Sequence, residues 1–251
     1  MQKYFPTMLD RPETSQIVAS IFYSVIAFFS LPFILLLFMQ GSFDNPTTLS
    51  IIEIIYHVIN FIVMISIFWR YLADSFINVQ ADSKTFKSTL EISVALMFVL
   101  SVVIGVVFAT KEPSIGNLVA GGTLPLAEME LFTLSGNLVV MNPIFGTICL
   151  VVLVPFTTSC VYYAATFAPI CNNKPWLAYL VVTLYLAFPR LCNGLTYWPL
   201  EEELVLYLTQ LPFHLIACWA YQKTDTIWAP IATHAIVNLL TCGLILVRYF
   251  L

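Results

Sequence analysis

Long apolar runs separated by short polar stretches dominate the sequence. Seven of these runs approach the length of a membrane-spanning helix, at about 17–39, 49–69, 90–109, 142–167, 176–191, 202–221 and 228–249. A helix needs roughly 20 mostly apolar residues to cross the hydrocarbon core of a bilayer. The pattern therefore predicts an all-α fold, a polytopic transmembrane helical bundle of seven spans, or of eight if one further segment crosses.

The segment 110–142 is the least regular part of the pattern. Glu128 and Glu130 interrupt a moderately apolar stretch that is too short and too polar for an ordinary span. We interpret it as a re-entrant or interfacial segment. It divides the chain into a polar N-terminal tail at 1–16, three N-terminal membrane spans at 17–109, the irregular segment at 110–142 and a C-terminal membrane core at 143–251.

Composition agrees with a membrane protein and argues against other classes. With 60% hydrophobic residues, 10% charged residues and a mean hydropathy of +0.90, the chain has too few polar groups to cover a soluble globule. A net charge of -4 without a basic run argues against nucleic acid as a partner. The lipid bilayer is the expected surrounding of the chain. The six cysteines show no C-x-x-C pairing, so we expect free buried thiols.

The distribution of Lys and Arg predicts the orientation. If the chain has seven spans, most of these residues lie on the side of the N-terminal tail. Lys and Arg are enriched in cytoplasmic loops. We therefore expect a multi-pass protein of the plasma membrane with a cytoplasmic N terminus. An eighth span would invert the later loops.

Polar side chains within two of the spans mark candidate sites. His234 and Asn238 are four residues apart in one run, and Glu53 and His57 have the same spacing in another. Residues four apart share a helix face, and lipid offers such groups no hydrogen bond. His234 and Asn238 either bond a neighbouring helix or belong to a functional site. Glu53 and His57 are expected to contact each other or the interface, away from His234.

The sequence around His234 resembles a known motif. Trp228, His234 and Asn238 form the pattern W-x5-H-x3-N directly after the polar corner 223–225. It resembles the third motif of the CPBP family, the CAAX proteases and bacteriocin-processing (Abi-type) enzymes, which are intramembrane metalloproteases. The resemblance covers about 151–240. It implies that His234 and Asn238 are catalytic, that a divalent metal such as zinc is bound, and that the partner is a peptide or membrane protein.

The first motif of that family, P-x-x-E-E-x3-R, is altered in this chain. Pro155 is in register, but Thr158 and Ser159 stand at the glutamate positions and Tyr163 at the arginine position. A hydroxyl pair cannot act as a general base near neutral pH without a group that takes its proton. The resemblance therefore implies a degenerate first motif.

The second motif, F-x3-H, is altered as well. Depending on the register, the histidine position falls on Cys192, as Phe188-x3-Cys192, or on Arg190. Of these two side chains, only the cysteine could still bind zinc, as a thiolate. A buried structural cysteine at a helix end is the alternative.

An acidic run offers a second route to a catalytic site. Glu202, Glu203 and Tyr207 imitate the first motif as E-E-x3-Y, and His214 follows on the same predicted helix. Glu203, Tyr207 and His214 fall on one helix face. Glu202 and Glu203 could thus act in catalysis beside His234, with His214 as a further binding or metal candidate. Alternatively, the acids form a solvated first turn.

The sequence leaves three functions open. The first is an intramembrane metallopeptidase that uses His234 and Asn238 with a base and a ligand from the acidic run, His214 or Cys192. The second, favoured by the altered first motif, is a catalytically silent relative that binds or regulates another membrane protein. The third is a transporter, which has less support because no pair of broken helices with repeat symmetry is visible.

Overall fold

The computed structural model describes residues 11–29, 34, 46–111, 138–194 and 200–250. The secondary structure of these residues is helical, with no strand among them, which confirms the all-α prediction. The segment 112–137, with Glu128 and Glu130, lies outside the described residues. The interpretation of that segment as re-entrant or interfacial therefore stays a prediction.

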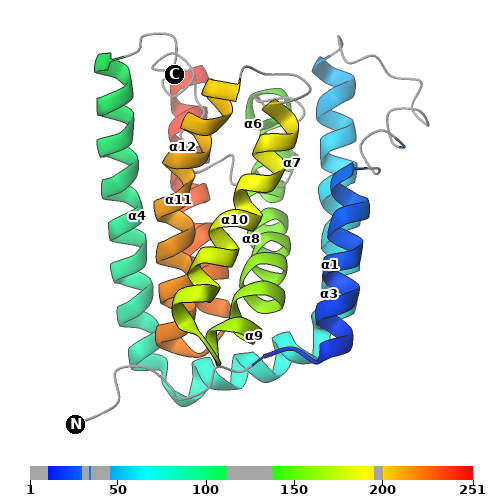
Figure 1. The fold of residues 1–251 in the computed structure, drawn as a ribbon. Helices are drawn as coiled ribbons and strands as arrows, with labels where there is room; N and C mark the ends of the chain where they lie inside the picture. Colours follow the sequence, from blue (N-terminus) through cyan, green and yellow to red (C-terminus); the bar gives the residue numbers. More distant parts are fainter. Residues whose placement is uncertain (1–10, 30–33, 35–45, 112–137, 195–199, 251) are drawn as a thin grey trace.

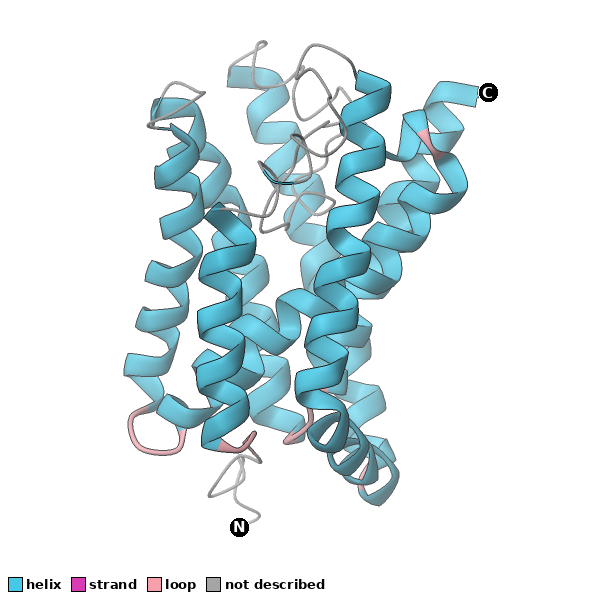
Figure 2. Ribbon diagram, turned by 90° about the vertical axis from the view of Figure 1, so that its right-hand side faces the viewer, coloured by secondary structure: helices cyan, strands magenta, loops and turns pink. Residues whose placement is uncertain are grey.

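The helices form a bundle whose members run mostly in the vertical direction of Figure 1. Figure 2 shows the same bundle from the side. Outside the centre, the helices are α1 (Thr14–Phe29), α3 (Pro46–Ala81), α4 (Ser83–Lys111), α6 (Leu138–Met141), α10 (Pro175–Gly194), α11 (Leu200–Thr224) and α12 (Trp228–Phe250).

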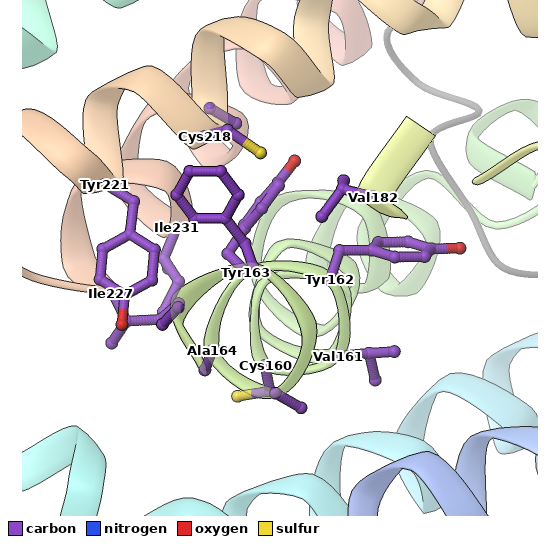
Figure 3. Packing of buried hydrophobic residues seen from close by; sticks show 14 of the residues in the cluster. Cys160, Val161, Tyr162, Tyr163, Ala164, Val182, Cys218, Tyr221, Ile227 and Ile231 are labelled. Atoms are coloured by element: carbon purple, nitrogen blue, oxygen red, sulfur yellow. The ribbon is translucent and has the colours of Figure 1, made fainter. Parts of the chain in front are cut away.

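The stretch from Pro143 to Cys171 forms the centre of the bundle. It consists of α7 (Pro143–Ile148), η1 (Cys149–Leu153), α8 (Val154–Thr158), η2 (Ser159–Phe167) and α9 (Ala168–Cys171), where η marks π-helical segments. Parts of it contact α1, α3, α10, α11 and α12. Every residue from 157 to 168 is buried. Figure 3 looks along this stretch and shows that Cys160, Tyr162 and Tyr163 point in different directions, each into the packed interior.

Two described stretches are long and apolar enough to cross a membrane, Ser50–Ala81 and Pro143–Cys171. They agree with the second and fourth apolar runs of the sequence. The other helices do not pass the same test over their described residues. The number of spans, seven or eight, therefore stays a prediction.

The polar stretch between the apolar runs 49–69 and 90–109 predicts a loop from about Arg70 to Thr89, and this prediction is wrong. α3 continues to Ala81, and α4 begins at Ser83 after a turn at Asp82. The polar residues that suggested a loop, such as Arg70 and Asp74, are exposed on the outer side of α3, whereas Tyr71 and Ser75 are buried on its inner side. A helix with one exposed, polar side has a composition similar to that of a polar loop, so composition alone does not distinguish them.

Asp82 fixes the start of α4. Its Oδ1 accepts a hydrogen bond of 3.1 Å from the backbone N–H of Thr85. Such an N-terminal cap satisfies a backbone donor that has no partner within the helix. Hydrogen bonds from the Thr85 side chain and backbone lower the pKa of Asp82 below its usual value.

Asp82→Ala is expected to lower the free energy of unfolding by about 1 kcal/mol, the typical loss for a removed cap. Asp82→Asn is the matched control, because it retains an acceptor oxygen. Since the folded state lowers the pKa of Asp82, its charge stabilises the fold above the ordinary Asp pKa, and this stabilisation disappears as the pH falls through the lowered value. Unfolding midpoints in detergent micelles as a function of pH should show this loss for wild type and not for Asp82→Asn.

Candidate functional site

α12 turns its polar residues toward the protein and exposes apolar residues on the opposite side. His234, Asn238 and Thr241 are buried, and the spacing of four and three residues places them along one helix face. Ile236, Leu239 and Leu240 are exposed on the other side. His234 is only 1% exposed. The prediction that His234 faces the protein is therefore confirmed.

Asn238 holds α12 against the central helix. Its Nδ2 donates a hydrogen bond of 2.7 Å to the carbonyl oxygen of Leu150 in η1. The π-helical register explains why that carbonyl needs a donor: Val154 N–H bonds to Cys149 O, five residues back. The next residue in this register is Pro155, which has no N–H to offer Leu150. The proline of the first motif and the asparagine of the third are thus linked through one backbone oxygen.

Asn238→Ala is expected to lower the free energy of unfolding by about 0.6–2 kcal/mol, the range for interhelical hydrogen bonds in membranes. In a Pro155→Ala background the loss should be smaller by at least about 0.5 kcal/mol, because residue 155 regains an N–H for Leu150 O. A double-mutant cycle measured by reversible unfolding in mixed micelles gives this coupling. Strictly additive losses would contradict the link.

His234 has no hydrogen-bond partner on either ring nitrogen among the described residues. The Oγ of Ser159, the Oγ1 of Thr233 and the Oδ1 of Asn238 are also buried and without a partner in this part of the protein. α8, which ends at Thr158, packs against α12, so the segment that leads to the first-motif positions lies beside the His234 helix. We use the name interior polar cluster for these four buried residues, His234, Thr233 and Asn238 on α12 and Ser159 on the neighbouring central stretch.

Tyr163 and His214 form a second buried contact. The Tyr163 hydroxyl lies 2.8 Å from Nδ1 of His214, and the ring of Tyr162 packs edge-on against the same imidazole. The hydrogen bond joins η2 to α11, and α10 packs against both segments. The residue at the arginine position of the first motif therefore contacts the histidine of the acidic-run helix. That contact was not apparent from the sequence.

Residues 140–240 match the family model described as type II CAAX prenyl endopeptidase Rce1-like. Over this segment, the chain resembles the CAAX protease family. The predicted CPBP resemblance is confirmed, and the chain is a membrane protein. No curated protein and no solved structure matches it. The match includes the central helix, α10, α11 and the part of α12 that holds His234 and Asn238.

The three motif regions of this CAAX protease-like segment are only partly adjacent. α12 contacts α8, as expected for the first and third motifs. α10, the helix of the second motif, packs mainly on α11 and η2 in the described residues. The side chains of Arg190, Cys192, Glu202 and Glu203 lie outside those that the structure describes, so their predicted roles stay untested.

The described side chains of the CAAX protease-like segment do not assemble a zinc site. A structural or catalytic zinc ion takes at least three protein ligands. Within the described residues, no group of three or more His, Cys, Asp or Glu side chains could hold a metal. His234 offers free nitrogens, but Thr158 and Ser159 bring neutral hydroxyl groups to the positions of the family carboxylates. The predicted zinc therefore gains no support from these residues.

A hydrogen-bonded corner fixes the beginning of the His234 helix. Asp225 has a left-handed φ of 52°, and the following Thr226 is fully buried. Thr226 Oγ1 donates to Ser75 O at 2.9 Å and accepts from Trp228 N–H at 3.3 Å. Ser75 Oγ in turn accepts from Ile227 N–H at 3.1 Å. The corner thus binds the first turn of α12 to α3.

Trp228 belongs to the same corner. Its indole Nε1–H donates to Leu72 O at 3.0 Å, and its ring packs edge-on against Phe76 and Phe156. A tryptophan beside a polar corner at the start of an apolar run is typical of a membrane interface. The structure instead gives Trp228 a role in joining α3, α8 and α12. The partners on α3, Leu72 and Phe76, are about 150 residues away along the chain, which is why the sequence pattern did not reveal them.

Glu53 and His57 are both buried on α3. The carboxylate of Glu53 interacts electrostatically with His57. Ser50 and Asn60 lie on the same helix face, where Ser50 Oγ accepts from Asn142 and Asn60 Oδ1 accepts from the Tyr23 hydroxyl. The predicted interaction within the pair is present.

Proposed function

We propose that this chain is a catalytically silent, multi-pass relative of the CAAX proteases that binds a peptide segment of another membrane protein at the interior polar cluster. The observation that carries the proposal is the chemistry of positions 158 and 159. Thr158 and Ser159 are buried hydroxyl residues on the stretch that packs against the His234 helix. Without the paired glutamates, the interior polar cluster has hydrogen-bonding capacity but no described general base other than His234.

The unmet hydrogen bonds of the cluster favour a peptide as the ligand. A buried polar group without a partner costs about 1–3 kcal/mol. A neutral imidazole offers one donor and one acceptor, a hydroxyl offers both, and the Asn238 oxygen is an acceptor. A peptide group also has one donor and one acceptor, so a bound backbone segment would satisfy these groups without introducing charge into the interior.

An active intramembrane metallopeptidase is the second candidate. Two observations favour it: the matched family is one of endopeptidases, and both nitrogens of His234 are available. In this candidate, Glu202 or Glu203 supplies the base, Asn238 assists, and His214 or Cys192 completes the metal ligands. The two candidates share the multi-pass topology, a cytoplasmic N terminus and a place in the plasma membrane.

The experiment compares wild type with His234→Ala in liposomes, with and without a zinc chelator. A photo-crosslinking amino acid at position 159 should capture a polypeptide, whereas the same probe at Leu239, which is 52% exposed on the outer side of α12, should capture lipid. For the silent binder, His234→Ala should weaken capture by about 3–30-fold, equivalent to the loss of one hydrogen bond in a membrane. Chelator should have no effect on capture.

Cleavage of a prenylated CAAX peptide by the same preparations distinguishes the candidates. The proposal expects no chelator-sensitive cleavage. For a metallopeptidase, removal of a positioned acid–base group lowers the rate by about a hundredfold or more. Chelator-sensitive cleavage that is lost in His234→Ala and in Glu203→Gln would refute the silent binder and establish the second candidate.

A further inference from the structure

α3 is longer than a membrane crossing requires. It has 36 residues, which at 1.5 Å per residue is about 54 Å, against a hydrocarbon core of about 30 Å. The residues from Pro46 to about 69 are sufficient for the crossing. The last turns of α3 must therefore either extend into water, remain in lipid or follow the surface of the membrane.

Figure 1 shows the cyan end of α3 running across the lower end of the bundle before α4 begins. Its inner side is bound to the corner between α11 and α12. The Tyr71 hydroxyl bonds to that of Tyr221, and Asn78 Nδ2 donates to Asp225 O at 2.9 Å. With the Ser75–Thr226 bonds, these contacts prevent the segment from extending away from the bundle.

The outer side of this segment has two distinct flanks. Trp69 and Phe76, seven residues apart and so on one flank, are 65% and 45% exposed. Arg70 and Asp74 are exposed on the other flank, and Ile77, 61% exposed, lies between the two. A helix with one side docked on protein, one aromatic flank and one charged flank fits the boundary between hydrocarbon and water.

The charges of this region balance. The exposed cations from 69 to 91 are Arg70, Lys84 and Lys87, and the exposed anions are Asp74, Asp82 and Glu91. A balanced segment gains little from an anionic surface, whereas Trp side chains are favoured at the headgroup level of any bilayer. The chemistry therefore fits zwitterionic lipid headgroups rather than an anionic patch.

We propose that residues 69–81 of α3 form an interfacial helix that lies in the headgroup layer of the membrane, with Trp69 and Phe76 facing the lipid. Trp176, the second residue of α10, is 67% exposed, and α10 begins at the lower end of the bundle in Figure 1, so we expect a second aromatic contact with the lipid there. Because the same helix bonds the corner before α12, the lipid surface and the start of the His234 helix are held by one rigid element. The inference requires only a membrane-embedded chain, not the proposed binding function.

The test measures the depth of Trp69 in the full-length protein reconstituted in phosphatidylcholine liposomes. The emission of Trp69 is obtained by subtracting the fluorescence of Trp69→Phe from that of wild type. Lipids brominated near the headgroup should quench it about twofold or more strongly than lipids brominated near the chain end. Phe76→Trp in the Trp69→Phe background should show the same depth, and Asp74→Trp should instead be quenched by aqueous iodide. These variants change exposed positions, so folding is checked by their elution as single species.

Each other result overturns the proposal. Stronger quenching by deep bromine places the segment inside the hydrocarbon. Quenching of Trp69 by iodide alone places it in water. No quenching by either reagent shows that a second copy of the chain or another protein covers the aromatic flank. A thermal midpoint that rises on replacing phosphatidylcholine with phosphatidylglycerol would contradict the argument from balanced charge.

Discussion

Gly146→Ala is expected to lower the free energy of unfolding by about 2–3 kcal/mol, at the upper end of ordinary overpacking losses. A Cβ atom at Gly146 would lie 2.7 Å from Leu138 O, 2.8 Å from Leu138 C and 2.9 Å from Val139 Cα. These are backbone atoms of α6, so no side-chain rotation can relieve the contact. The helix itself must shift. Unfolding in mixed micelles, followed by tryptophan fluorescence, measures the loss.

The shift of α6 would extend beyond Gly146. Val139 packs with Leu150, Val154 and Cys242, and Leu138 packs with Cys149 and Leu153. Displacing α6 therefore disturbs both faces of η1 at the level where Asn238 bonds Leu150 O. We expect weaker peptide capture from position 159 in Gly146→Ala as a secondary effect of this packing change.

Gly243→Ala is the matched control. Gly243 is an exposed glycine in α12, and a Cβ atom there meets nothing within 4 Å. Replacing glycine by alanine inside a helix stabilises it by about 0.5–1 kcal/mol when there is space. The two substitutions are chemically identical and should have opposite signs. Equal effects would show that α6 and α7 are not in backbone contact.

The apolar pattern predicted the helical class and the inward direction of the polar residues on α12. Both follow from simple rules: long apolar runs form helices, and a buried imidazole or amide avoids lipid. The same rules wrongly predicted a loop after residue 70, because they do not distinguish polar residues on one flank of a helix from polar residues in a loop. Tyr71 and Ser75, which directly follow Arg70 and Asp74 and are four residues apart, are buried on the inner side of the helix and distinguish it from a loop.

The site itself could be predicted only in part. The residue types at 158, 159 and 234 were clear from motif spacing, and so was the loss of the glutamates. The bond from Asn238 to Leu150 depends on a one-residue shift into π-helical register before Pro155, which leaves no trace in hydropathy. The Ser75–Thr226 bonds join residues 151 positions apart, so only the fold brings them together.

Ser159→Glu is expected to lower the stability of the protein strongly and to report on the chemistry of the site. It restores one acidic residue of the first motif at a position that is fully buried and has no described cation beside it. An uncompensated charge in a protein interior is destabilising by about 3–5 kcal/mol. We therefore expect Ser159→Glu to unfold at much lower denaturant than wild type, and Ser159→Gln, which has the same shape without the charge, to lose far less.

The comparison of these two variants, with and without added zinc, also tests the proposed function. If the interior around His234 still provides the electrostatic environment of a metallopeptidase, Ser159→Glu will be as stable as Ser159→Gln, and added zinc will stabilise it further by mass action. If the cluster has become a neutral peptide-binding site, zinc will not rescue Ser159→Glu. We expect the second result, because the groups that the structure places there are hydroxyl, amide and imidazole side chains without a carboxylate partner among the described residues. Rescue by zinc would mean that only the acidic residue, and not the site, has been lost.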